Sequence, residues 1–349
     1  MNAWLAPILS LFVLLAVPAL AEAQKATKHA GQKKSVSSQA TGQKAQKGKP
    51  VAKKKTTSKS TAPKKKAQAA RKTAPTARVH EDTLGDGELN LRSGAVLVVD
   101  QETGEALYAK NADLKAPIAS ITKLMTAMVV LDSGLSLDEW IEINEEDVDR
   151  VKNTRSRLPV GTRLTRGELL HLALIASENR AASALSRAYP GGRAAFVEAM
   201  NRKAHRLGMY HTQFVDGTGL SSANRATASD LVRLVDAAYA YPIIRAVSTT
   251  GSYDVFLAQA EQFRTVAYTN TNVLTRSKDW NIGVSKTGFI NEAGHCLVMQ
   301  ARIAQQKVII ILLDSMGKVA RIGDAGRIRA WLENGAIGRY ANRRDDASA

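Results

Sequence analysis

Two polar residues, Ser120 and Lys123, interrupt an otherwise apolar stretch, and their spacing suits nucleophilic chemistry. Residues three apart on a helix lie on one face, a turn from each other. A serine hydroxyl is a weak nucleophile until a base removes its proton, and lysine can be that base when burial or a second cation lowers its pKa. A serine at a helix start also places free backbone N–H groups where an oxyanion would form. Alone, such a pair is weak evidence, because a capping serine and a surface lysine share this spacing.

Two further polar motifs make the pair more significant. Ser177-Glu178-Asn179 interrupts an apolar helical stretch, and Lys286-Thr287-Gly288 lies near the end of an expected inner strand. The chain therefore carries S-x-x-K, S-x-N and K-T-G in the order that is typical of penicillin-binding proteins and class A β-lactamases. Three ordered motifs in suitable elements predict a serine acyl-transfer site.

The chain resembles the low-molecular-mass penicillin-binding proteins, which are serine D-Ala-D-Ala peptidases acting on peptidoglycan. The resemblance is strongest to the D-alanyl-D-alanine endopeptidase type, also called the penicillin-binding protein 7 type. It covers about residues 90–338, and the segments that carry it are Pro117 to Ala127, Ser177 to Ala182, Gly208-Met209 and Lys286 to Val298.

This resemblance implies roles for the first two motifs. Ser120 would be the acylated nucleophile and Lys123 its general base. Ser177 and Asn179 would relay the proton and hold the peptide of the substrate. The role of Glu178 stays open, and a side chain facing solvent is compatible with its middle position in the motif.

The resemblance also implies how the third motif acts. Lys286 and Thr287 would bind the substrate carboxylate, and Gly288 would let the substrate backbone lie against the strand. The backbone N–H groups of Ser120 and Phe289 would form the oxyanion hole. Lys286 would also be the second cation that helps to keep the general base neutral.

Other chemistries lack their motifs. The sequence contains no H-E-x-x-H and no G-x-S-x-G, and Gly217-Thr218-Gly219 lacks the third glycine of a dinucleotide fingerprint. We therefore expect neither a metal nor a cofactor. The single cysteine, Cys296, is expected to be a small core residue of a strand. No Glu-x-x-x-Asn sequence occurs between Arg180 and Lys286, so the deacylation loop of class A β-lactamases is missing and fast β-lactam hydrolysis is not expected.

Two alternative functions stay open. One is a D-alanyl-D-alanine carboxypeptidase. Such enzymes usually continue into a β-rich domain and an amphipathic anchor, whereas this sequence ends soon after its last expected helix, which favours the endopeptidase. The other is a catalytically silent cell-wall-binding module. The expected partners are peptidoglycan peptides and β-lactams.

The elements that position these motifs predict an α/β (α+β) fold of the serine β-lactamase and penicillin-binding-protein transpeptidase type. Apolar runs at both ends of the domain predict an antiparallel sheet, and helices between them predict a helical insertion. The expected strands are 95–99, 106–109, 281–289, 295–303 and 307–313. The expected helices are 120–134, 165–188, 193–207, 227–239 and 318–334.

The charge is concentrated near the amino-terminal end. Residues 24–80 hold 17 Lys and Arg and no Asp or Glu, which leaves 32 basic against 31 acidic side chains in residues 81–349. The composition of residues 24–80 predicts a disordered Lys-rich linker that could bind an anionic envelope polymer, with nucleic acid the less favoured polyanion. An evenly basic DNA-binding domain is excluded.

The first residues predict export. An apolar run too short to span a bilayer, followed by small residues, indicates a signal peptide over residues 1–23. We therefore expect a periplasmic protein with a peptidase domain at 81–340 and a polar tail at 341–349.

Overall fold

The computed structural model describes residues 89–259 and 262–346. The predicted signal peptide and Lys-rich linker lie outside these ranges, as do residues 347–349 of the polar tail. Within the described ranges, no helix has the length and apolar character that a membrane span requires.

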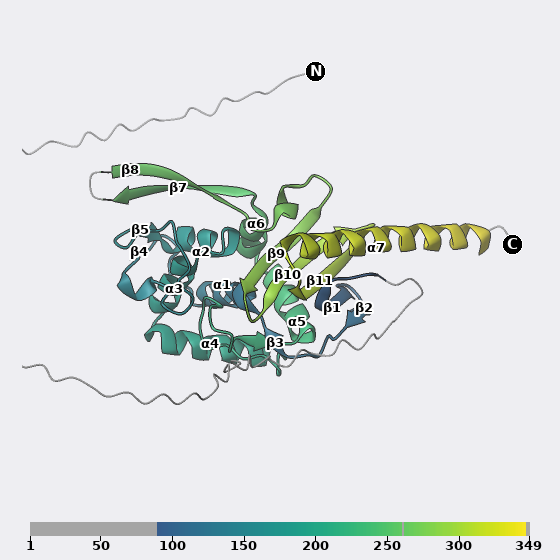
Figure 1. Cartoon of the computed structure of the whole chain (residues 1–349), viewed down its shortest axis with the longest axis horizontal. Helices are drawn as coiled ribbons and strands as arrows, with labels where there is room; N and C mark the ends of the chain where they lie inside the picture. Colours follow the sequence, from purple (N-terminus) through teal and green to yellow (C-terminus); the bar gives the residue numbers. More distant parts are fainter. Residues whose placement is uncertain (1–88, 260–261, 347–349) are drawn as a thin grey trace, which may run out of the picture. The chain divides into compact units, whose positions relative to one another are not determined.

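A five-stranded antiparallel sheet lies at the centre of the described domain, in the order β2-β1-β11-β10-β9 (Figure 1). The strand from the start of the domain, β1, pairs with β11 from its end, so the prediction of a sheet built from both ends is confirmed. The strands are β1 Ser93–Asp100, β2 Ala106–Lys110, β9 Asn281–Ile290, β10 Gly294–Ile303 and β11 Gln306–Ser315.

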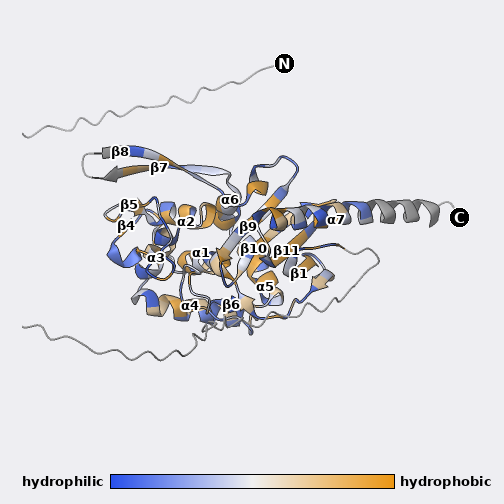
Figure 2. Cartoon of the chain, in the orientation of Figure 1, coloured by the Kyte–Doolittle hydropathy of each residue, from blue (hydrophilic) through white to orange (hydrophobic). Residues whose placement is uncertain are grey.

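The inner strands are nearly continuous apolar runs because both faces of the sheet are covered. One face packs under α7 (Lys318–Asp346), and the other packs against α5 (Ala228–Tyr239) and the helical part (Figures 1 and 2). The buried carboxylate of Asp324 on α7 accepts hydrogen bonds from the backbone N–H and hydroxyl of Ser93, which fixes α7 to β1. The backbone of α7 continues past the expected end at 334, since a glycine at 335 costs only about 1 kcal/mol inside a helix and no proline follows.

The helical part, which comprises residues 111–280 between β2 and β9, carries the first two motifs. The predicted helix 165–188 is divided in two, because residues 176–178 leave the helical path. The predicted capping box at its start is present, with Thr165 and Glu168 bonded reciprocally. The remaining helices are η1 Ala119–Ile121, α1 Thr122–Asp132, η2 Glu145–Asp147, α2 Arg166–Ile175, α3 Asn179–Arg187, α4 Gly192–Arg206, α6 Pro242–Thr249 and η3 Val273–Arg276.

Three short two-stranded sheets complete the described ranges, and none was expected from the sequence. The largest is a hairpin whose inward side chains, Val255, Leu257 and Tyr268, are buried while their neighbours face solvent. The pairs are β3 Ala116–Pro117 with β6 Arg225–Ala226, β4 Trp140–Glu142 with β5 Arg163–Thr165, and β7 Ser252–Gln259 with β8 Gln262–Thr269.

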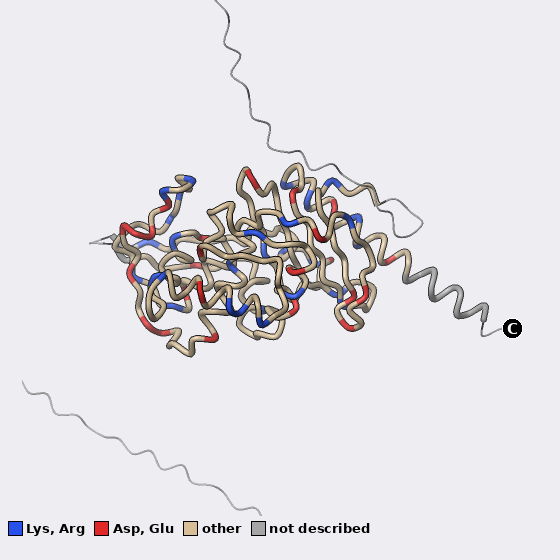
Figure 3. Tube along the Cα trace, turned by 90° about the horizontal axis from the view of Figure 1, so that it is seen from below, with Lys and Arg blue, Asp and Glu red and all other residues tan. Residues whose placement is uncertain are grey.

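Basic and acidic positions are interspersed along the described chain, and neither kind gathers in one part of it (Figure 3). Several of them form ion pairs, among which the fully buried carboxylate of Asp147 contacts Arg187 at 2.8 Å and Arg193 at 3.1 Å. This mixture agrees with the near-neutral charge that the sequence gives to residues 81–349.

Candidate active site

The amine of Lys123 is the centre of the site. It is fully buried, and its Nζ donates to Ser120 Oγ at 3.0 Å, to Asn179 Oδ1 at 2.8 Å and to the carbonyl oxygen of Thr218 at 2.6 Å. The structure therefore brings together the serine and lysine of the first motif and the asparagine of the second. A hydroxyl 3.0 Å from a buried amine has the geometry of a nucleophile and its base.

Ser120 lies in a tight turn rather than at the first residue of a helix, which differs from the sequence expectation. The 3₁₀ turn η1 holds it, and α1 begins two residues later. Ala119 has a left-handed φ of 47°, and the backbone turns sharply into the helix there. Two glycines pack against this turn. A Cβ on Gly219 would lie 2.0 Å from the carbonyl oxygen of Ala119, and one on Gly288 would lie 3.1 Å from Ser120 N.

Burial lowers the pKa of Lys123 to about 8, and the carboxylates of Asp216, Glu178 and Asp149 oppose that shift. The sequence analysis named burial and a second cation, Lys286, as causes that could lower this pKa. Of these two, burial is the larger cause, because an ammonium loses its hydration in an apolar surrounding, and Lys286 is not among the groups that shift the pKa of Lys123. About one-eleventh of Lys123 is therefore the free base at pH 7, and about half at pH 8.

Lys286 lies on β9, with its ammonium group almost completely buried. Burial and the positive charges of Lys123 and Arg321 hold its pKa well below the usual range. Its Nζ donates to the carbonyl oxygen of Thr287 at 2.9 Å. An anion bound beside Lys286 would stabilise the ammonium and raise this pKa again.

The S-x-N motif forms the turn between α2 and α3. Ser177 has a left-handed φ of 59°, a conformation that costs energy for a non-glycine residue and clusters at functional sites. Ser177 is not among the hydrogen-bond partners of Lys123. Glu178 does not face solvent, since it is only 8% exposed, and its carboxylate accepts from the N–H of Arg180 as a cap of α3.

The strand β9 forms the edge of the five-stranded sheet and passes directly beside the nucleophile. The backbone of Phe289, the residue after Gly288, belongs to this edge. Its side chain is 52% exposed and stacks on His295 of β10, with ring centroids 4.3 Å apart. The N–H groups assigned to the oxyanion hole thus come from η1 and from an edge strand next to it.

The sequence analysis did not identify Thr218 as part of the site. Its carbonyl position is set by Asp216, whose carboxylate accepts from the N–H groups of Thr218, Gly219 and Ser221 at 2.6 to 3.0 Å. The Asp-Gly-Thr-Gly sequence was a usable signal, because an aspartate that bonds the backbone two or three residues ahead is typical of such turns. Arg321, buried near Lys286, was also missed.

A loop after η2 borders the site on the side of α3. Thr154 Oγ1 in this loop accepts from Asn179 Nδ2 at 2.9 Å, which orients the amide whose oxygen accepts from Lys123. Lys152 in the same loop forms an ion pair of 2.5 Å with Glu292 in the turn between β9 and β10. The loop therefore links the helical part to the sheet at this end of the site.

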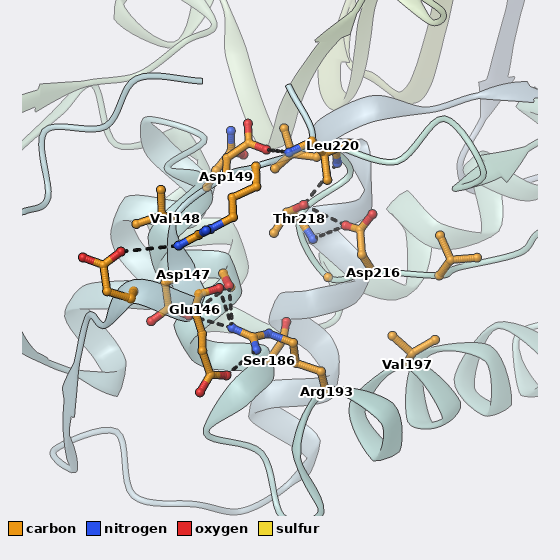
Figure 4. A pocket seen from close by; sticks show the side chains of 17 residues that line it. Glu146, Asp147, Val148, Asp149, Ser186, Arg193, Val197, Asp216, Thr218 and Leu220 are labelled. Atoms are coloured by element: carbon orange, nitrogen blue, oxygen red, sulfur yellow. Dashed lines mark hydrogen bonds and ion pairs between the residues drawn. The ribbon is translucent and has the colours of Figure 1, made fainter. Parts of the chain in front are cut away.

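A cavity of about 560 Å³ adjoins the site (Figure 4). Its lining includes Asn179 and Thr218, the two residues that bond Lys123 besides the serine. Its other walls carry valines, such as Val148 and Val197, together with acidic side chains, and an ion pair of Arg193 with Glu146 lies on its border. Ser120, Lys123 and the K-T-G residues do not line this cavity, so it lies behind Asn179 and Thr218 and not at the nucleophile.

Cys296 is buried in β10, and burial raises its pKa to about 11. A thiol with so high a pKa carries almost no thiolate at neutral pH. The interpretation of Cys296 as a core residue is confirmed.

Comparisons with known proteins agree with the fold and the motifs. The family model described as D-alanyl-D-alanine carboxypeptidase, peptidase family S11, matches residues 80–317. Over 247 residues the chain is 50% identical to a D-alanyl-D-alanine endopeptidase of Pseudomonas aeruginosa and 44% identical to one of Escherichia coli. Each match covers 71% of this chain and 79% of the relative.

Solved structures show the same fold. The DD-transpeptidase of Streptomyces K15 is similar with a TM-score of 0.64 at 33% identity, over 68% of this chain and 95% of that one. Penicillin-binding protein D2 of Listeria monocytogenes, in its cefotaxime-bound form, is similar with a TM-score of 0.58 at 30% identity. The match covers 69% of this chain and 97% of that one. The chain belongs to the D-alanyl-D-alanine carboxypeptidase family and has the fold of penicillin-binding serine peptidases. The predicted family and fold are confirmed.

Proposed function

We propose that the protein is a serine D-Ala-D-Ala endopeptidase that cleaves D-Ala-meso-diaminopimelate cross-links of peptidoglycan through an acyl-enzyme on Ser120. The observation that carries this proposal is the buried amine of Lys123, with a pKa of about 8, 3.0 Å from Ser120 Oγ. A neutral amine in that position can accept the hydroxyl proton as the oxygen attacks.

The reaction has two halves. Lys123 takes the proton of Ser120, whose Oγ bonds to the D-Ala carbonyl carbon, and the backbone N–H groups of Ser120 and Phe289 stabilise the oxyanion. The C–N bond then breaks, and the proton held by Lys123 passes through Ser177 to the nitrogen of the leaving amine. Water next attacks the ester carbonyl while Lys123 takes one of its protons. As the ester C–O bond breaks, Lys123 returns that proton to Ser120 Oγ, which restores the free serine and the neutral amine.

The remaining motif residues position the substrate. Lys286 and Thr287 bind the carboxylate of the leaving residue. Because burial and neighbouring cations hold the pKa of the free Lys286 low, the incoming anion raises that pKa, and its binding is coupled to protonation of the amine. Asn179 holds the acyl-side peptide. Gly288 allows the substrate backbone to approach β9, where even a methyl group would lie 3.0 Å from the carbonyl oxygen of Ile118.

β-Lactams follow the same first half, since opening of the lactam ring esterifies the serine. The sequence carries no Glu-x-x-x-Asn loop between its second and third motifs to hydrolyse this ester rapidly. The listerial relative, whose structure is of a cefotaxime-bound form, supports penicillin binding. Acylation by a labelled penicillin also separates this proposal from a catalytically silent wall-binding module, which would stay unlabelled.

The endopeptidase activity is favoured over the carboxypeptidase activity by the two relatives with 50% and 44% identity, both named endopeptidases. A Streptomyces carboxypeptidase is more distant, at 36%. Mass spectrometry of cross-linked muropeptide dimers and of monomeric pentapeptides after digestion decides between them. We expect dimers to become monomers, and loss of terminal D-Ala alone would assign the carboxypeptidase.

The amino-terminal sequence supports a location for this activity. Residues 1–23 export the chain to the periplasm, and the 17 basic residues of 24–80 bind an anionic envelope polymer and tether the peptidase domain, 81–340. The segment 341–349 is a polar tail without a catalytic role.

Truncation tests the tether. A chain that starts at Glu81 should cleave small muropeptides like the full chain, but its retention on isolated envelopes should lose the steep salt dependence that polyanion binding produces. Unchanged envelope retention and salt slope would contradict the tether.

A further inference from the structure

An ion pair joins the two sides of the site at one end. Lys152 Nζ, in the loop after η2, lies 2.5 Å from Glu292 Oε1, in the turn between β9 and β10. Both side chains are partly exposed, at 25% and 43%. The hydrogen bond from Lys152 lowers the pKa of Glu292, so this carboxylate is ionised at neutral pH. A positive and a negative charge are therefore held side by side at the border of the site.

The two segments that carry these charges are held independently of the ion pair. In the loop, the carboxylate of Asp149 accepts hydrogen bonds at 2.8 to 3.0 Å from the backbone N–H groups of Val151, Lys152 and Thr154. In the turn, the N–H of Ala293 donates to the carbonyl oxygen of Ile290 at 3.1 Å. Removal of either charge should therefore leave the backbone of both segments in place.

The direction of β9 places the turn on the acyl side of the substrate. The carboxylate of the leaving residue is assigned to Lys286 and Thr287, and Gly288, the next residue, lies beside the nucleophile. A substrate that continues in this direction passes the end of β9 at Ile290 and reaches the turn of Glu292. The acyl group thus extends toward the negative member of the ion pair.

The loop approaches the acyl group from the opposite side. Asn179, which is assigned to the acyl-side peptide, donates to Thr154, two residues after Lys152. In the cross-link of the proposed function, the residue before the acyl D-Ala is meso-diaminopimelate, and its free end carries an ammonium and a carboxylate on one carbon. That zwitterionic end lies on the same side of the reaction as the ion pair.

The two pairs of charges are complementary. The lysine ammonium donates three hydrogen bonds and the glutamate carboxylate only accepts them, so each binds the group of opposite charge. A partly exposed ion pair contributes little to stability, and exchanging it for two pairs with the substrate costs little. A substrate with only one of the two charges would leave one protein charge without a partner.

We propose that Lys152 and Glu292 form a subsite for the zwitterionic end of the acyl-side residue: Lys152 binds its carboxylate and Glu292 binds its ammonium group. The inference rests on the proposed acyl-transfer function. It adds a specificity determinant for the acyl side of the substrate, supplied from outside the three motifs.

Penicillins with different acyl side chains test this subsite. The side chain of penicillin N ends in an ammonium and a carboxylate on one carbon, its N-acetyl derivative keeps only the carboxylate, and the side chain of benzylpenicillin is uncharged. The second-order rate constant of acylation is measured with all three for the wild type, Lys152→Gln and Glu292→Gln. Glu102→Gln is the matched control, since Glu102 forms an ion pair of 3.1 Å with Lys307 at the opposite edge of the sheet. Thermal unfolding reports folding.

We expect the wild type to prefer penicillin N to its N-acetyl derivative by about tenfold, the size of one contact with a charged group. Glu292→Gln should abolish this preference, because the ammonium loses its partner. Lys152→Gln should slow acylation by both compounds about tenfold, because both keep the carboxylate. Acylation by benzylpenicillin should change less than about twofold in both variants, and Glu102→Gln should match the wild type with all three penicillins.

Equal losses with all three penicillins would assign the ion pair a structural role and overturn the inference. A wild type without the preference, a Glu292→Gln variant that keeps it, or a Lys152→Gln variant with unchanged rates would also overturn it, while acylation by benzylpenicillin would leave the proposed function standing. A wild type that benzylpenicillin does not acylate would overturn the proposed function, and the inference with it.

Discussion

The protonation state of Lys123 should set the pH dependence of acylation. With a pKa of about 8, roughly one-eleventh of the molecules hold the free base at pH 7, and half hold it at pH 8. The second-order rate constant of acylation by benzylpenicillin should therefore rise about tenfold from pH 6 to pH 7 and about fivefold from pH 7 to pH 8. A lysine with its ordinary pKa of 10.5 would still gain tenfold per unit at pH 9.

Substitution of Glu178 should shift the pKa of Lys123 in a direction that follows from the structure. Its buried carboxylate favours the ammonium form of Lys123, so Glu178→Gln should lower the pKa of Lys123 and move the profile to lower pH. The amide can still cap α3 through its oxygen. Acylation at pH 7 should become faster, by less than about elevenfold, because one-eleventh of the base is already free.

Stopped-flow or quenched labelling from pH 6 to pH 9.5 measures both profiles. Glu198→Gln is the control, since Glu198 is an exposed carboxylate on α4 that pairs with Arg202. A midpoint far from 8 in the wild type, or a Glu178→Gln midpoint that is unchanged or higher, would refute the electrostatic account of the base.

Two other substitutions test the third motif and the turn at the nucleophile. The variant Lys286→Gln should stay folded, and its acylation rate should fall about 10- to 100-fold. This is the size of a lost charge-assisted contact of about 1.5 to 3 kcal/mol. An unchanged acylation rate would remove Lys286 from the carboxylate subsite. Gly219→Ala should abolish acylation and lower the melting temperature, because its methyl group would overlap the carbonyl of Ala119, next to the nucleophile. Gly104 is the control, because it has the same left-handed φ but an added methyl group would meet no atom within 4 Å. Gly104→Ala should therefore lose only about 1 to 2 kcal/mol of stability and stay active. Equal effects at the two glycines would contradict the steric argument.

The elements that the sequence predicted well were those with a single strong pattern. The apolar runs of β9 to β11 and the capping box of α2 depend on local signals that the fold retains. The hairpin of β7 and β8 lacks a clean alternation of apolar and polar residues, because the exposed Phe256 stands between the buried Val255 and Leu257. Its buried side packs against α2 rather than against the main sheet, and this contact depends on the tertiary fold.

The site was predictable in its motifs but not in its electrostatics. The i, i+3 spacing predicted the contact of Ser120 with Lys123, although Ser120 lies in the 3₁₀ turn before α1. The carbonyl of Thr218 reaches the same amine from 95 residues away. No sequence pattern shows that burial, rather than Lys286, is the largest cause of the low pKa of Lys123. The burial of Glu178 likewise depends on how two helices meet.

The most direct test of the central claim is to locate the penicillin adduct. Intact-mass measurement followed by peptide mapping of the labelled protein should find one penicilloyl group per chain, on Ser120, and Ser120→Ala should fold normally and carry none. An adduct on any other residue, or a Ser120→Ala variant that still forms a stable acyl adduct, would contradict the assignment of Ser120 as the nucleophile.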